Sequence, residues 1–84
     1  NQNYTFTATG STSGSVWGTI IYTDDSNLAT AAVHAGVLTV GQTGTIIVMV
    51  LAGQSSYAGS VQNGITAWSY GSWAGSYRFV IASG

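Results

Sequence analysis

The chain has 84 residues and only three charged side chains, 4% of the total, against roughly 25% in an ordinary globular domain. Its hydrophobic content of 45% argues against disorder, which combines low hydrophobicity with high net charge. The single arginine excludes nucleic-acid binding and anchoring on an anionic membrane, since both need several basic side chains. Cysteine is absent, so a domain this small must be stabilised by packing, an ion or a partner chain rather than by disulfides.

Residues 3–9 alternate in polarity, with Tyr4, Phe6 and Ala8 on one face and threonines on the other. Such alternation predicts a strand buried on one side. A Gly- and Ser-rich connector follows, so the chain divides into an N-terminal strand with its connector, residues 1–13, and a main domain, residues 14–84. A terminal strand on a flexible connector can fold back onto its own sheet or complete the sheet of a neighbouring chain. In the second case Tyr4 and Phe6 would enter a groove of the next subunit.

A strand with a break at Gly18 is predicted over residues 16–22, which are aromatic and β-branched. Residues 23–36 then favour a helix, since they are rich in alanine and end at a glycine. Either Asp25 or Ser26 is suited to cap its N-terminus. Four apolar residues follow the helical repeat and predict its buried stripe: Leu28, Ala31, Ala32 and Ala35.

The run of residues 45–51 is apolar on both alternating faces, which is typical of a central strand covered on two sides. The following residues, 52–64, are loop-rich and end in Asn63-Gly64, a strong tight-turn signal. Short strands are predicted over residues 65–70 and 77–81. The expected class is therefore α+β, with one short central helix packed against five to six mostly antiparallel strands.

Five ordered fragments of this sequence resemble motifs of the LCCL domain. They are GSVWGT at 14–19, YTDDS at 22–26, AAVHAG at 31–36, YAGS at 57–60 with NGI at 63–65, and WAGSY at 73–77. The resemblance implies a central helix wrapped by β structure and an extracellular location. Animal members carry a cysteine in the helix, near the position of Ala29, so this chain is more similar to cysteine-free, bacterial-type relatives. A family member in an endotoxin-sensing protease suggests recognition of lipopolysaccharide or another cell-envelope glycan.

The titratable residues do not predict an enzyme. His34 lies near the end of the predicted helix, about two turns from Asp24 and Asp25 at its start, so a catalytic triad is not expected. We expect His34 to pack or cap near the helix C-terminus. The two aspartates either cap the helix or, with oxygens from Ser26 or Asn27, bind Ca²⁺. No other cofactor is expected.

Aromatic residues provide a candidate ligand site. Trp68 and Tyr70 could stack on a sugar ring while Asn63 bonds its hydroxyl groups, whereas Trp17 and Trp73 lie in family motifs and are expected to pack in the core. Gln62 and Ser72 could also bond the sugar. Asn3-Tyr4-Thr5 is in addition an N-glycosylation sequon, and an attached glycan would help an almost uncharged surface stay soluble.

Two functional hypotheses follow. The first is a non-enzymatic extracellular assembly module that forms a homo-oligomer or polymer through strand edges, because charges that usually keep such edges apart are scarce. The alternative is a glycan or lipopolysaccharide recognition module within a larger secreted protein. Neither hypothesis involves membrane insertion, since the longest apolar run is far shorter than the about 20 residues needed to cross a bilayer.

Overall fold

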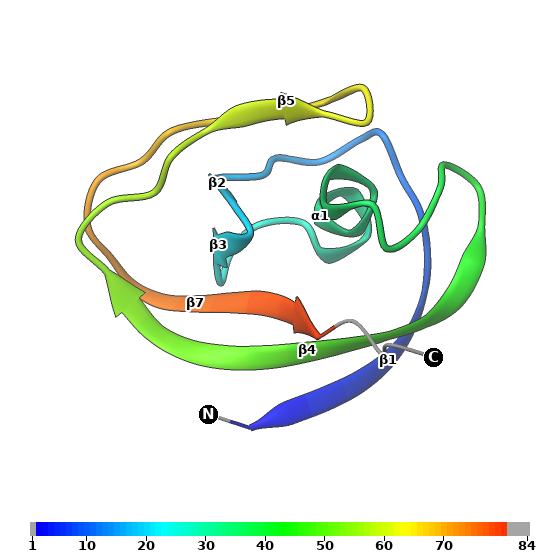
Figure 1. Ribbon diagram of the computed structural model, residues 1–84, viewed down its shortest axis with the longest axis horizontal. Coiled ribbons are helices and arrows are strands. Elements are labelled where there is room, and N and C mark those ends of the chain that lie inside the picture. The colour runs from blue at the N-terminus through cyan, green and yellow to red at the C-terminus, as the bar shows by residue number, and fades with distance from the viewer. Residues whose placement is uncertain (1, 81–84) are drawn as a thin grey trace.

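The computed structural model describes residues 2–80, which form one helix and two antiparallel sheets. The larger sheet has the strand order β1-β4-β7-β3-β2, and the smaller one pairs β5 with β6. The elements are β1 (Asn3–Thr9), β2 (Gly18–Thr19), β3 (Ile21–Thr23), α1 (Leu28–Ala35), β4 (Thr43–Gln54), β5 (Ser60–Gln62), β6 (Ile65–Ala67) and β7 (Trp73–Val80). In Figure 1 the helix lies at the centre, with β4 and β7 below it, β1 starting below β4 and rising to the right, and β5 above. The predicted α+β class is confirmed, and several of the seven strands in the described residues are very short.

The helix begins one residue later than a cap at Ser26 would place it and two residues later than a cap at Asp25 would. Asn27 is its N-cap, and the Asn27 side chain accepts a hydrogen bond from the backbone N–H of Thr30 at 3.0 Å. Ser26 is instead buried, and its hydroxyl accepts from the backbone N–H of Trp17. Gly36 ends the helix in the left-handed conformation, as predicted. The prediction of Asp25 or Ser26 as the cap is therefore wrong, since an asparagine serves equally well one position later.

The predicted strand over residues 16–22 is in fact a tight hairpin. β2 and β3 pair with Gly18 opposite Tyr22 and Thr19 opposite Ile21, which leaves Ile20 alone at the tip. Gly18 has a φ of +106°, and a Cβ there would lie 2.2 Å from the Ile21 carbonyl oxygen. The chain thus reverses at Ile20, and Gly18 allows the two short strands to approach, because glycine tolerates both this φ and this contact.

Strand β4 lies between β1 and β7, but only one of its faces is covered within residues 2–80. Ile46 and Val48 belong to the core cluster that packs with the helix. Ile47 and Met49 point to the opposite face and are only half-buried. The prediction of a strand covered on both sides is therefore wrong, because its continuous apolar run meets the helix on one side only.

The small sheet closes over the helix from the other side. The chain turns at Asn63 and Gly64, both with positive φ (52° and 79°), so that Gln62 pairs with Ile65. This two-residue turn is the arrangement that Asn-Gly favours, and the predicted turn is confirmed. The sequence did not predict β5, which lies in the segment interpreted as loop-rich. Of the last predicted strand, residues 77–80 belong to β7, and Ile81 lies outside the described residues.

The core lies between the two sheets and the helix. It joins the predicted stripe residues Ala31 and Ala32 to the rings of Tyr22, Tyr77 and Phe79. None of the three tryptophans is buried: Trp68 is exposed, and Trp17 and Trp73 are half-buried. The expectation that those two pack in the core is wrong, since smaller aromatic residues fill the space beside the alanine-rich helix.

In this structure β1 folds back onto its own chain, pairing along its length with β4 from Asn3–Met49 to Thr9–Thr43. Ala8 packs against the core, but Tyr4 and Phe6 remain 45% and 42% exposed. A helix of eight residues is about 12 Å long, whereas a seven-residue strand spans about 23 Å. The helix is therefore too short to cover the start of β1, and the prediction that this strand is buried on one side is wrong for Tyr4 and Phe6.

Candidate ligand-binding site

A cavity lined by three aromatic residues and an acid lies beside the turn that precedes the helix. Its volume is about 260 Å³ and its walls are Trp17, Thr23, Asp25, Tyr70 and Trp73; we call it the aromatic pocket. The volume is just below the range typical of pockets for drug-sized ligands, so the pocket suits a group the size of one ring. Apolar walls with a few convergent polar groups are the usual composition of a small-molecule site.

The three rings form adjoining walls. The Trp17 and Tyr70 ring centroids are 6.5 Å apart with planes inclined at 68°, and the Tyr70 and Trp73 centroids are 5.6 Å apart with planes at 79°. Such near-perpendicular contacts are favoured by the ring quadrupoles. The rings therefore hold one another in a box-like arrangement.

Backbone hydrogen bonds fix the positions of the two main-chain segments that carry Trp17 and Tyr70. The Trp17 N–H donates to the buried Ser26 hydroxyl at 3.0 Å, and its carbonyl accepts from the Thr23 N–H at 3.1 Å. Tyr70 and Tyr57 exchange both of their backbone hydrogen bonds, at 2.8 and 3.0 Å. Tyr57 is itself buried. Thus Trp17 and Tyr70 are held through partners that belong to the packed interior.

Trp73 is oriented by a side-chain hydrogen bond. Its indole Nε1–H donates to Oδ1 of Asp24 at 2.7 Å. The aspartate is in turn held by its backbone N–H, which donates to the Gly75 carbonyl at 3.0 Å. A Cβ at Gly75 would lie 2.2 Å from Oδ2 of Asp24. Gly75 therefore leaves room for the carboxylate that positions the indole.

The structure brings together only part of the predicted sugar site. Tyr70 lines the aromatic pocket, but Trp68, 58% exposed, does not. Asn63 lies elsewhere, at the end of the helix, where its side-chain Nδ2 donates to the His34 carbonyl at 3.0 Å. The pocket instead uses Trp17 and Trp73, which sequence reasoning assigned to the core.

The two aspartates, predicted as caps or as Ca²⁺ ligands, lie in the turn before Asn27. Asp24 accepts the Trp73 indole hydrogen bond, and Asp25 is exposed at the pocket wall. Within residues 2–80, no three His, Cys, Asp or Glu side chains gather as metal ligands would. A Ca²⁺ site here would depend largely on neutral oxygens, and it stays a prediction.

His34 is fully buried and hydrogen-bonded at both ring nitrogens. Nδ1 lies 2.9 Å from the Tyr22 hydroxyl, and Nε2 lies 3.1 Å from the Ser60 carbonyl oxygen. A carbonyl can only accept, so Nε2 donates to it; an imidazole with its proton on Nε2 accepts the hydrogen bond of the Tyr22 hydroxyl at Nδ1. Burial raises the pKa of Tyr22 to about 12, which keeps that donor protonated.

A serine also lies beside His34, which the sequence did not reveal. The Ser60 Oγ is 3.2 Å from Nε2 and 2.6 Å from the Thr19 hydroxyl. Since Nε2 carries a proton, it cannot take one from the serine, and Nδ1 faces a phenol instead of the acid that would complete a triad. The group is a structural hydrogen-bond network that joins the helix to β3 and β5.

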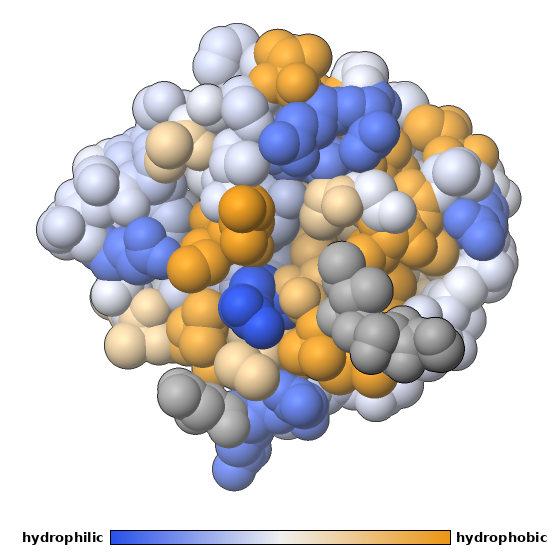
Figure 2. Space-filling view, viewed as in Figure 1, coloured by the Kyte–Doolittle hydropathy of each residue, from blue (hydrophilic) through white to orange (hydrophobic). Residues whose placement is uncertain are grey.

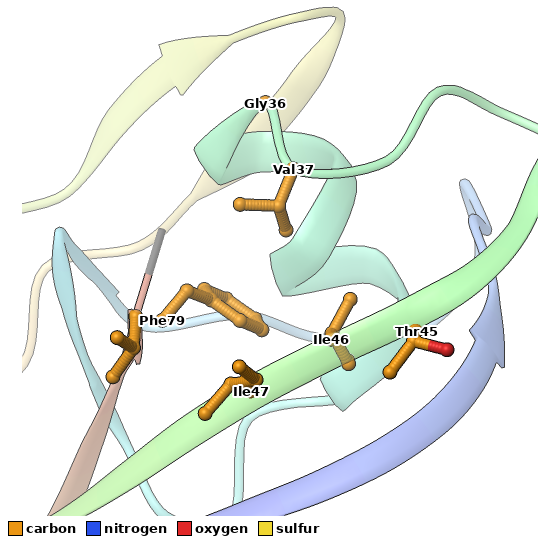
Figure 3. Close-up of a pocket in the computed structure, with 7 residues that line it drawn as sticks. Gly36, Val37, Thr45, Ile46, Ile47 and Phe79 are labelled. Carbon is orange, nitrogen blue, oxygen red and sulfur yellow. The ribbon is translucent and has the colours of Figure 1, made fainter. Parts of the chain in front are cut away.

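A second cavity of about 300 Å³ lies where the helix end meets β4 and β7. Figure 3 shows Val37, Ile46 and Phe79 directed toward one another there. Thr45 is the one polar side chain among its described lining residues. Without converging polar groups it offers little specificity, so the aromatic pocket is the better candidate.

The residues of the proposed assembly strand lie on an exposed edge of the sheet. Tyr4 and Phe6 line a largely apolar groove of about 230 Å³ with Leu28 and Val50, and Asp24 is its one charged lining residue among residues 2–80. Asn3 of the glycosylation sequon is exposed at the start of the same strand. On the face seen in Figure 2, apolar side chains reach the surface in separate patches with polar residues between them.

Comparison with known sequences establishes the family. The sequence model of the LCCL domain matches residues 3–77. This chain belongs to the LCCL domain family. The resemblance inferred from the spaced fragments is thus confirmed, and the match includes β1 together with the whole aromatic pocket.

Relatives share this domain within much longer proteins. Vitrin of Homo sapiens is 44% identical over 62 residues, 74% of this chain and 9% of vitrin. Vitrin of Bos taurus is 42% identical over 69 residues, 82% of this chain and 10% of that protein. Clotting factor C of Tachypleus tridentatus is 41% identical over 72 residues, which are 86% of this chain and 7% of that protein. This chain therefore spans a tenth or less of the length of each of these three relatives.

No helix within residues 2–80 is long and apolar enough to cross a membrane.

The pocket itself could have been found from the sequence only in part. Trp17 and Asp24 lie close in sequence, and the cluster of Tyr70 and Trp73 is visible, but nothing local indicates that these two segments meet. The contact depends on Asp24 lying beside Gly75 across the β3–β7 pairing.

Proposed function

We propose that this LCCL domain is a non-enzymatic, extracellular recognition module that binds a saccharide unit in the aromatic pocket. The observation that carries the proposal is the box of Trp17, Tyr70 and Trp73 with the Asp25 carboxylate at its wall. A sugar ring has apolar faces that pack on aromatic rings and hydroxyl groups that donate to a carboxylate. The pocket thus matches both parts of a saccharide.

The geometry supports this function because the pocket is formed before any ligand arrives. Hydrogen bonds to Ser26, Asp24 and Tyr57 already hold the three aromatic residues. Preorganisation lowers the entropy lost when a ligand binds. The chain lacks a cluster of basic residues for phosphate groups, so the proposal concerns the sugar part of an envelope glycan.

Tryptophan fluorescence titrations with cellotetraose, the tetramer of N-acetylglucosamine and the tetramer of glucosamine would test the site. Trp73→Ala and Tyr70→Ala should each weaken binding at least tenfold. Trp68→Ala is the matched control, since Trp68 is more exposed than either and lies outside the pocket, and it should retain affinity. Near-ultraviolet circular dichroism checks that each variant is folded. No binding of any tetramer, or a loss with Trp68→Ala alone, would contradict the proposal.

Self-association through β1 is a second candidate function. It is supported by an uncharged edge strand on which Tyr4 and Phe6 are almost half exposed beside a largely apolar groove. Unpaired edges without charges favour edge-to-edge pairing. Size-exclusion chromatography and electron microscopy should show assemblies that shift to monomer when Tyr4→Ser and Phe6→Ser are combined, whereas Thr5→Ser should change nothing. A monodisperse monomer of the unaltered chain at high concentration would refute this function.

A further inference from the structure

The charges of this chain are distributed unevenly around the aromatic pocket. Both acidic residues, Asp24 and Asp25, lie in the turn beside it, and Asp25 is part of its wall. The one cationic residue, Arg78, lies in β7 opposite Met49 and does not line the pocket. The local field at the pocket is therefore negative, although the net charge of the chain is only −1.

The aromatic walls favour a cation as well. The faces of tryptophan and tyrosine rings attract an ammonium group, and tryptophan attracts it most strongly. The indole of Trp73 donates a hydrogen bond to a carboxylate at 2.7 Å, and a charged acceptor polarises the ring toward greater electron density. The rings and the acids thus act in the same direction.

From these observations we infer that the aromatic pocket selects a sugar that carries a free, protonated amino group. The inference rests on the saccharide site proposed above and specifies its ligand class. The amine would lie between the Asp25 carboxylate and the aromatic rings, while the sugar ring packs on Trp17 or Trp73. N-acetylation removes the positive charge and adds bulk, and the pocket, at about 260 Å³, has limited room for it.

Asp25→Asn removes the negative charge of the side chain and keeps its size, so the variant tests the effect of the charge separately from that of the pocket's shape. Because Asp25 is exposed, an ion pair there is partly screened by solvent, and we expect the variant to weaken binding of the glucosamine tetramer about two- to fivefold. Affinity for cellotetraose should fall by a smaller factor, because the amide oxygen of the introduced asparagine still accepts a hydrogen bond from a sugar hydroxyl group. The titrations are made at a slightly acidic pH, at which the sugar amine is protonated, and are repeated at high salt, which should weaken glucosamine binding selectively.

The outcomes separate this inference from the proposed function. Tighter binding of the glucosamine tetramer than of both other tetramers, lost in part with Asp25→Asn, supports it. Equal affinities for the three tetramers, or an unchanged glucosamine affinity in Asp25→Asn, overturn it and leave the saccharide site in place. If choline chloride binds and no tetramer does, the pocket takes a different ammonium compound, and both proposals fail.

Discussion

The hydrogen bond between Tyr22 and His34 offers a direct test of how the helix is held. Tyr22→Phe removes only the hydroxyl, which lies 2.9 Å from Nδ1 of His34. The ring can stay in place, where it contacts His34 edge-on at 5.6 Å between centroids and Phe79 at 5.9 Å. Both partners are 0% exposed, so water cannot replace the lost donor.

A buried acceptor left without a donor costs about 1–3 kcal/mol of unfolding free energy. In a domain of this size each kcal/mol lowers the melting temperature by about 4–8 °C, so a fall of at least about 4 °C is expected. Tyr4→Phe is the control, since the Tyr4 hydroxyl donates to the nearby Gln2 side chain at the surface, and the stability of this variant should stay within about 0.5 kcal/mol of that of the unaltered chain. Urea unfolding followed by fluorescence measures both. Equal stability of the two variants would refute the role assigned to this network.

Three further predictions concern pH and glycine positions. Burial raises the pKa of Tyr22 to about 12 and raises that of Tyr77 even more, so the folded chain keeps protons that the unfolded chain loses. These groups should leave the free energy of unfolding unchanged below pH 10. As the pH rises toward 12, the free energy of unfolding should fall, by up to about 3 kcal/mol from Tyr22 alone. A free energy of unfolding that stays constant from pH 10 to 12 would contradict this prediction. Gly75→Ala should displace the Asp24 carboxylate and shift the indole N–H resonance of Trp73 while the fold persists, whereas an unshifted resonance would show that the carboxylate has room to adapt. Gly64→Ala places a side chain at a φ of 79° and should lower stability by about 1 kcal/mol in urea titrations, a loss that an alternative turn geometry would prevent.

Local sequence signals predicted the elements whose stability is local. The Asn63-Gly64 turn and the Gly36 helix end depend on backbone conformations that few residues adopt, and the sequence shows them directly. The alanine stripe of the helix was also visible, since the helical repeat of its apolar residues can be recognised within one short stretch of sequence.

Features that depend on distant contacts were not predictable in this way. The continuous apolar run of β4 gave no sign that the helix would cover only one face. The depth of burial of Tyr4 and Phe6 depended on how far that helix reaches along β1. The assignment of Trp17 and Trp73 to the core failed because Tyr22 and Phe79 occupy it, which only the assembled sheet reveals.

The aromatic pocket was likewise invisible locally, because it joins segments about fifty residues apart in sequence, a separation shown by the hydrogen bond between Asp24 and Trp73. Acidic residues at a helix start are most simply interpreted as caps. Their use as an indole acceptor and a pocket wall appears only when β3 and β7 pair.

The central claim is that Trp17, Tyr70 and Trp73 form a ligand pocket, and two-dimensional ¹H–¹⁵N spectra test it most directly. The three indole N–H groups report separately on each tryptophan. Adding the glucosamine tetramer should move the Trp17 and Trp73 indole signals in a saturable manner and leave that of Trp68 in place. A saturable shift at Trp68, with the other two signals unmoved, would contradict the account.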